Sequence, residues 1–231
     1  MGSLRRVSDN AEIRAITFDV GGTLIEPWPS VGDIYAEVAA DFGLTSLSPA
    51  ELNRAFVTAW RAKQDFDYSE SAWLELVAAT FDRPANELPS GFFDRLYARF
   101  TEPDAWRIFA DVAPALEALA KLPVRLAVIS NWDDRLRPLL ATLDLARFFE
   151  SATISCEAGF AKPAPEIFAA AAARLALPPN AILHVGDSRR EDVEGARAAG
   201  FRTALVDRAG GGGDLDSLEA ITALIGLGMV D

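Results

Sequence analysis

Short apolar runs alternate along the chain with segments whose apolar residues recur at helical spacing. The runs are rich in β-forming residues and lie at residues 13–18, 125–130, 152–155, 181–185 and 203–206. Between them, patterns such as Val112, Leu116 and Leu119 place apolar side chains on one helical face. Strands that alternate with helices form a parallel sheet with helices on both faces. The pattern predicts an α/β fold whose active site lies at the carboxyl ends of the strands.

The pattern also predicts how the chain ends. A helix expected over residues 190–199 stops before Gly200, a residue suited to the left-handed conformation that follows many helices. Four consecutive glycines at residues 210–213 predict a flexible loop. Residues 215–227 are apolar enough to form a last helix that packs on the sheet.

One long stretch, between Pro27 and Trp106, interrupts the alternation. It shows several helical patterns in series and no convincing strand, and Ser48 to Glu51 form a capping-box sequence. It holds 14 of the 22 aromatic residues, enough for a core of its own. We predict a helical domain over residues 27–106 inserted into a core domain of residues 1–26 and 107–231. The alternative is an extra layer packed permanently on the sheet.

Composition narrows the function. The 231 residues carry 22 basic and 34 acidic side chains, a net charge of -12. This charge argues against binding to nucleic acid or to anionic membranes, so a phosphorylated ligand would need a local positive site. A single cysteine, Cys156, excludes an internal disulfide and a multi-cysteine zinc site. With no signal peptide and no run long enough to span a bilayer, we expect a cytoplasmic monomer or homodimer acting on a small molecule.

The first candidate for chemistry is Asp19, at the end of the first apolar run. It leads into a turn made of Val20, Gly21, Gly22 and Thr23, whose backbone can approach an anion closely. A carboxylate in this position can act as a covalent nucleophile.

Three further motifs follow at strand ends or helix starts. Ser130 and Asn131 close the second predicted strand, and Lys162 precedes a proline-rich helix start. Gly186, Asp187 and Ser188 end another strand, and Asp192 comes five residues after Asp187. Two carboxylates at a sheet edge suit a hard cation. His184, the only histidine, lies within a strand and is expected in the core, which leaves no histidine base for a Ser-His-Asp mechanism.

Taken in this order, the four motifs resemble those of the haloacid dehalogenase-like hydrolase superfamily, subfamily IA, and the helical insert resembles its C1 cap. The resemblance implies a Rossmann-like core with a mobile cap. It implies that Asp19 attacks phosphorus to form an aspartyl-phosphate, that Ser130 and Lys162 bind the phosphoryl group, and that Asn131, Thr23 and Gly22 help to bind the substrate. The implied cofactor is Mg²⁺, held by the side chains of Asp19 and Asp187 and the carbonyl of Gly21, with Asp192 in support.

The sequence departs from the family pattern at Gly21. Phosphatases of this family have a second aspartate there, which protonates the leaving group and then activates water. Loss of such a group typically costs about 10²- to 10⁴-fold in rate. Three interpretations follow: a Mg²⁺-dependent phosphatase that replaces the acid, a phosphonatase or dehalogenase-like hydrolase on the same scaffold, or a binding protein with little activity.

The alternatives make different demands on the sequence. Dehalogenases have Ser and Asn where this chain has Gly186 and Asp187, and phosphonatases need a cap lysine, for which Lys63 is the one candidate. Candidates for substrate selection, chosen by position, are Arg61, Lys63, Tyr68 and Trp132. Closure of the cap would exclude water, with Gly32 or residues near Trp106 beside the hinges.

Overall fold

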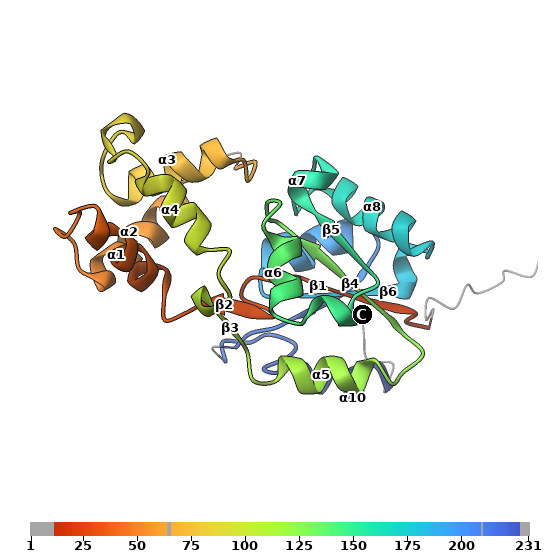
Figure 1. Ribbon diagram of the computed structural model, residues 1–231. Coiled ribbons are helices and arrows are strands. Elements are labelled where there is room, and N and C mark those ends of the chain that lie inside the picture. The colour runs from red at the N-terminus through yellow and green to blue at the C-terminus, as the bar shows by residue number, and fades with distance from the viewer. Residues whose placement is uncertain (1–11, 64–65, 209, 227–231) are drawn as a thin grey trace, which may run out of the picture.

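The computed structural model describes residues 12–63, 66–208 and 210–226, which form a sheet-based part and an all-helical part (Figure 1). Five parallel strands make the sheet in the order β5-β4-β1-β6-β7. They are β1 (Ala15–Phe18), β4 (Arg125–Ser130), β5 (Ser151–Ile154), β6 (Ile182–Gly186) and β7 (Arg202–Leu205). Each matches one predicted apolar run to within two residues at either end. The parallel sheet is confirmed.

Helices cover both faces of the sheet because its strands are apolar on both sides. Ile16 and Phe18 pack with α5 (Val112–Leu119), α6 (Leu136–Thr142) and α10 (Ile221–Gly226) on one face. Ala15 and Ile129 pack with α8 (Pro165–Leu175) and α9 (Gly195–Ala198) on the other. The short α7 (Ser155–Ala158) follows β5. The fold is therefore a Rossmann-like α/β fold with an inserted helical unit.

Two predicted C-terminal helices differ in detail. The helix expected over residues 190–199 is a π-helical segment (Arg189–Glu194) followed by α9, and Gly200 adopts the expected left-handed conformation with φ +83°. The helix expected over residues 215–227 begins later, with a 3₁₀ turn (Leu218–Ala220) before α10, because Leu215 pairs with Val206 in a β-bridge. Leu227 lies outside the described residues. No helix in the described part of the chain could cross a lipid bilayer.

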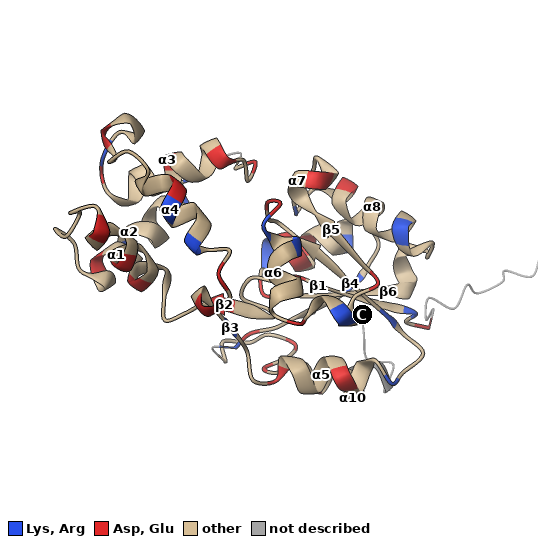
Figure 2. Ribbon diagram, in the orientation of Figure 1, with Lys and Arg blue, Asp and Glu red and all other residues tan. Residues whose placement is uncertain are grey.

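The helical part contains α1 (Val31–Asp41), α2 (Pro49–Ala62), α3 (Glu70–Thr80) and α4 (Phe92–Arg99). Its side chains form a hydrophobic cluster of their own around Ile34, Tyr35 and Phe92. The predicted capping box at α2 is present, with Ser48 and Glu51 bonded to each other's backbone. Acidic residues mark α1, and acidic and basic residues are otherwise interspersed (Figure 2). Short 3₁₀ turns complete the chain at Ala85–Glu87, Pro103–Ala105, Ala146–Phe148 and Pro179–Ala181.

A two-stranded antiparallel ribbon, which the sequence pattern does not predict, joins the two parts. Its strands are β2 (Ile25–Pro27) and β3 (Trp106–Ile108). Strands of three residues are too short to show a period-two pattern, which explains the omission. The Glu26 carboxylate pairs with Arg107 across the ribbon. Both chain crossings run through this ribbon, so the domain boundaries predicted at residues 26 and 107 fall within it and stay predictions.

Gly32 lies inside α1, against α2, and not in the connection between the two parts. A Cβ atom at Gly32 would lie 2.1 Å from the carbonyl oxygen of Pro49. We expect Gly32→Ala to lower the free energy of unfolding by roughly 1–3 kcal/mol, because backbone atoms of α2 must move. Urea denaturation measures the change, with exposed Ala40→Ser on the same helix as the control. Equal stability of Gly32→Ala and the control would show that the helices do not need this close approach.

Candidate active site

The carboxyl ends of the three central strands bring three of the predicted motifs together. Asp19 follows β1, Ser130 ends β4 and Asp187 follows β6. Because β1 lies between β4 and β6, Asp19 occupies the centre of this edge. The strand order thus explains why residues 111 positions apart in sequence meet, as Ser130 and Asp19 do.

Lys162, the remaining motif, connects Asp19 at this edge to Asp192. Its Nζ donates to Asp19 Oδ1 at 2.6 Å and to Asp192 Oδ1 at 2.6 Å. Burial alone would lower the pKa of Lys162, but the two carboxylates outweigh it and raise that pKa. The lysine is therefore a permanent cation. Ser130 Oγ also donates to Asp19 Oδ1, at 2.9 Å. Both donors use the same oxygen, and no hydrogen bond from the described residues reaches Asp19 Oδ2.

Asn131 fixes the backbone of Lys162. Its Oδ1 accepts from Lys162 N at 2.6 Å, and its Nδ2 donates to Lys162 O at 2.9 Å and to Glu191 Oε2 at 3.1 Å. These contacts engage both ends of the side-chain amide. The geometry thus gives Asn131 a positioning task, and its predicted substrate contact stays a prediction.

Asp192 is held from three sides. Besides Lys162, its Oδ1 lies 3.1 Å from His184 Nε2, and its Oδ2 accepts from Ser188 N at 2.8 Å. Burial favours the neutral carboxyl, but Lys162 and His184 outweigh it and lower the pKa of Asp192. A Cβ at Gly186 would lie 2.2 Å from Asp192 Cγ, so this approach requires glycine. Asp192 orients Lys162 and keeps a negative charge near it.

Asp187 supplies the third carboxylate of an acidic cluster with Asp19 and Asp192, whose oxygens lie within 4.8 Å of one another. Asp187 lines the cavity and is exposed to solvent there, while the surrounding protein still desolvates its carboxyl group. Burial and the charges of Asp19 and Asp192 raise the pKa of Asp187 to about 7. Gly22 has φ +79°, and a Cβ there would lie 2.3 Å from Asp187 Oδ2. One lysine does not balance these carboxylates, and their oxygens suit a hard divalent cation such as Mg²⁺.

Thr23 does not take the place expected of it. Its side chain is fully buried, it does not line the cavity, and its hydroxyl has no hydrogen-bond partner among the described residues. The backbone folds back after Gly22, where the N–H groups of Leu24 and Ile25 donate to the carbonyl of Val20. This reversal carries the Thr23 side chain inward, and its predicted role in substrate binding stays a prediction. Gly21 and Gly22 do line the cavity.

An indole ring occupies the space beside Gly21. A Cβ at Gly21 would lie 3.2 Å from Cζ3 of Trp132, and the Trp132 ring packs against that of Trp106 at 5.2 Å. A side chain at position 21 would therefore require the indole to shift by a few tenths of an ångström. Trp132, a candidate for substrate selection by position, lines the cavity.

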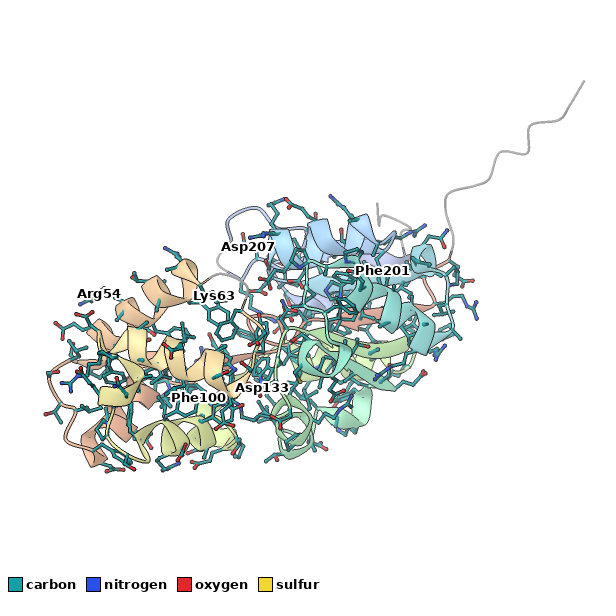
Figure 3. All side chains as sticks on the ribbon, turned by 90° about the horizontal axis from the view of Figure 1, so that it is seen from above. Arg54, Lys63, Phe100, Asp133, Phe201 and Asp207 are labelled. Carbon is teal, nitrogen blue, oxygen red and sulfur yellow. The ribbon has the colours of Figure 1, made fainter. Side chains whose placement is uncertain are left out.

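The other positional candidates differ in their placement. Tyr68 lines the cavity with a left-handed backbone, φ 62°, and burial followed by the charge of Glu191 raises its pKa. Lys63 and Arg61 are not among the cavity residues, and the Lys63 ammonium lies 3.5 Å from the ring centroid of Trp60. Figure 3 shows Lys63 on the side of the helical part that faces the sheet and Arg54 on its far side. Burial lowers the pKa of Lys63, and the charge of Glu191, a cavity residue, acts on Lys63 in the opposite direction. The phosphonatase interpretation stays a prediction.

Sequence reasoning missed two polar residues of the cavity. Glu191 accepts a hydrogen bond from Asn131, and burial raises its pKa. The sequence alone does not distinguish this residue from an ordinary acidic residue in the first turn of a helix. Arg135 pairs with Asp133, donates from Nη1 to the carbonyl of Tyr97 at 2.9 Å, and lies 3.5 Å over the Tyr97 ring. Arg135 thus joins the sheet part to α4. No hydrophobic periodicity in the sequence indicates a role for Arg135. The neighbouring Asp133 and Asp134 are the one feature that could have suggested an ion pair there.

The site opens into a cavity of about 480 Å³ between the two parts. Its floor carries Asp19, Ser130, Lys162 and Asp187, and its upper walls carry aromatic side chains of α2, α3 and α4. A volume of this size takes a small organic molecule. The arrangement offers a carboxylate nucleophile, two hydrogen-bond donors and a cation-binding cluster at the bottom of an apolar chamber.

A comparison with protein families matches residues 13–200 to the haloacid dehalogenase-like hydrolases. The chain belongs to this hydrolase family, and the resemblance found in the sequence is confirmed.

Individual relatives agree with this assignment. Haloacid dehalogenase-like hydrolase domain-containing protein 3 of Danio rerio is 32% identical over 212 residues, 86% of this chain and 87% of the relative. A phosphoglycolate phosphatase of Salmonella paratyphi A is 30% identical over 205 residues, 81% of this chain and 79% of the relative. The crystal structure of a HAD-hydrolase of Bacillus subtilis bound to magnesium has the same fold, with a TM-score of 0.75, 17% identity and coverage of 93% of this chain and 99% of that one.

The raised pKa of Asp187 makes the metal-free protein sensitive to pH. The folded state keeps a proton that the unfolded state releases near pH 3.8, so stability falls as the pH rises from about 4 to 7. We expect Asp187→Asn to remove this loss. At pH 7.5 the free energy of unfolding of the variant should exceed that of wild type by about 1 kcal/mol, and at pH 4 the two should be equal. The value is smaller than the full pKa shift implies because solvent screens the group.

Urea denaturation in EDTA at the two pH values measures this difference. Asp94→Asn, an exposed change on α4, is the matched control. Parallel pH profiles for wild type and Asp187→Asn would contradict the proposed carboxylate repulsion.

Proposed function

We propose that this hydrolase transfers the phosphoryl group of a small phosphomonoester to Asp19 and then to water, with Mg²⁺ as cofactor. The observation that carries the proposal is the convergence of Lys162 and Ser130 on one oxygen of Asp19 at the floor of the cavity. Phosphoryl transfer needs positioning and charge neutralisation more than elaborate covalent chemistry.

In the first step, the carboxylate of Asp19 attacks phosphorus. The new bond joins an Asp19 oxygen to phosphorus, and the bond from phosphorus to the ester oxygen breaks, so that the leaving group departs with the electron pair. Lys162 and Ser130 donate to Asp19 before the reaction, and they lie close enough to transfer these hydrogen bonds to phosphoryl oxygens as charge develops there. Asn131 and Asp192 hold Lys162 in place.

The second step hydrolyses the aspartyl-phosphate. Water attacks phosphorus, the bond to Asp19 breaks, and the proton that water loses is taken up by the departed ester oxygen. Side chains of Asp19 and Asp187 and the carbonyl of Gly21 would hold Mg²⁺, and Asp192 supports the cluster through Lys162. The metal would neutralise phosphoryl charge and let two anions approach each other.

The cap would control access. Both chain crossings run through the β2–β3 ribbon, and Arg135 ties α4 to the sheet part. Small rotations at the ribbon would open the cavity, and the contact of Arg135 with Tyr97 would favour the closed form.

Loss of Asp19 should abolish catalysis. We expect Asp19→Asn to reduce kcat by about 10³-fold or more, since the amide is a poor nucleophile. Lys162→Met should also lose activity, by at least about 10²-fold. A colorimetric phosphate assay with and without Mg²⁺, over phosphomonoesters, acyl phosphates and phosphonates, measures both changes, and a halide assay covers 2-haloacids.

The same panel separates the alternatives. Activity that survives in Asp19→Asn would contradict the nucleophile. Halide release from 2-haloacids in the absence of phosphate release would favour a dehalogenase. Activity that requires Gly21→Asp combined with Trp132→Ala would favour a binding protein that has lost its acid; the second change makes room for the new carboxylate.

Bound Mg²⁺ should stabilise the protein through the acidic cluster. We expect MgCl₂ to raise Tm by several degrees at pH 7.5 and by much less at pH 5, because Asp187 is protonated at the lower pH. Thermal unfolding monitored by circular dichroism checks this, and Asp187→Asn should remove the shift while the exposed control Asp94→Asn keeps it. An equal rise in Tm with MgCl₂ in Asp187→Asn would show that the cation binds elsewhere.

A further inference from the structure

We propose that the substrates are phosphomonoesters whose ester oxygen is attached directly to an aromatic ring, with the ring seated among the aromatic side chains of the cap. This proposal rests on the proposed function and goes on to name the class of leaving group. Two independent observations carry it: the indole beside Gly21 and the composition of the cavity walls.

The first observation concerns the proton. Gly21 provides no acid beside Asp19, and the Trp132 ring packs closely on it, 3.2 Å from a Cβ at that position. An alkoxide leaving group is about as basic as hydroxide, with water at a pKa of about 15.7, and needs an acid to protonate it. A phenol, like the tyrosine side chain, has a pKa of about 10, so an aryl oxide can depart unprotonated. The site is therefore suited to aryl esters.

The second observation concerns the walls of the cavity. Phe56 and Trp60 on α2 and Trp73 on α3 form a stack, with the Trp60 centroid 5.9 Å from Phe56 and 5.8 Å from Trp73 and interplanar angles of 20° and 22°. Trp60 and Trp73 pack in none of the three hydrophobic core clusters of the described residues. Their half-buried rings line the cavity and offer apolar contact area to a flat group, and the Lys63 ammonium lies over the Trp60 ring at 3.5 Å from its centroid.

Charge in the cavity argues against a small doubly anionic substrate. Lys162 and Arg135 are the cationic side chains among the described residues that line it, and both are paired with carboxylates. A second carboxylate on the substrate, as in phosphoglycolate, would meet Glu191 and the aromatic walls, and Lys63, the further cation that interacts with Glu191, is not among the cavity residues and lies over Trp60. An uncharged aromatic group meets no such penalty.

The size of the cavity agrees with a ring system larger than benzene. A cavity of about 480 Å³ lies in the size range of pockets that hold drug-sized ligands, which exceed a phosphoryl group alone. Its lining includes the stacked rings of α2 and α3 and the indole of Trp132.

The test compares matched esters on the full-length enzyme with Mg²⁺. 2-Naphthyl phosphate and 2-naphthylmethyl phosphate have similar bulk but differ in the basicity of the leaving oxygen, so we expect kcat/KM to favour the former by at least about 10²-fold. Phenyl phosphate lacks the second ring and should be about tenfold poorer than 2-naphthyl phosphate. Equal or better turnover of 2-naphthylmethyl phosphate or of phosphoglycolate would overturn the proposal.

Variants separate the two observations. Trp60→Ala should remove the advantage of naphthyl over phenyl, and Val57→Ala, an exposed change on the same helix, should keep it. Gly21→Asp combined with Trp132→Ala should lower the preference for aryl over alkyl esters by about tenfold or more, because an acid is restored. Unchanged preferences in both variants would overturn the assigned roles.

A binding measurement distinguishes failure of this inference from failure of the proposed function. Calorimetry with 2-naphthylmethylphosphonate and with methylphosphonate reports recognition without turnover, and we expect the former to bind at least tenfold more tightly. Tighter binding without hydrolysis of any ester would overturn the phosphatase and support the aromatic ligand class. Hydrolysis of esters with equal binding of the two phosphonates would support the phosphatase and overturn the aromatic class.

Discussion

The site depends on one buried cation shared by two carboxylates. Lys162 is 1% exposed and donates to both Asp19 and Asp192, so it joins the end of β1 to the segment that follows β6. Burying these charges is costly unless each finds partners, and removing any one of them leaves the others uncompensated. Asn131, Ser130 and the backbone of Ser188 supply the remaining hydrogen bonds. The same network leaves Asp187 in a strongly negative environment, which suits it to a metal ion.

A second constraint acts on the chemistry above this network. Trp132 packs tightly against Gly21, so that a side chain there would require the indole to shift, and the walls of the cavity are aromatic. The floor is therefore built to receive a phosphoryl group, while position 21 carries no acid and the two cations that line the chamber, Lys162 and Arg135, are paired with carboxylates. An aryl leaving group needs neither an acid at position 21 nor an unpaired cation. This links the absence of an aspartate at position 21 to the many aromatic residues of the helical insert.

The sequence predicted the site residues that lie at strand ends, and it missed those whose position depends on tertiary packing. Asp19, Ser130 and Asp187 could be brought together because parallel strands end at one edge of a sheet. The inward turn of Thr23 could not be foreseen, since it depends on the N–H groups of Leu24 and Ile25. The β2–β3 ribbon is too short to leave a pattern. Glu191 and Arg135 act through contacts with residues distant in sequence, and their own neighbourhoods resemble ordinary charged helix ends.

The central claim is that Asp19, held by Lys162 and Ser130, is the nucleophile. The most direct test is acid quenching during turnover of 2-naphthyl phosphate, followed by mass spectrometry of the peptides. The account predicts a transient phosphoryl group on the peptide that contains Asp19, formed with a burst of naphthol and absent in Asp19→Asn. Release of naphthol without any phosphorylated peptide, or with the phosphoryl group on another residue, would contradict it.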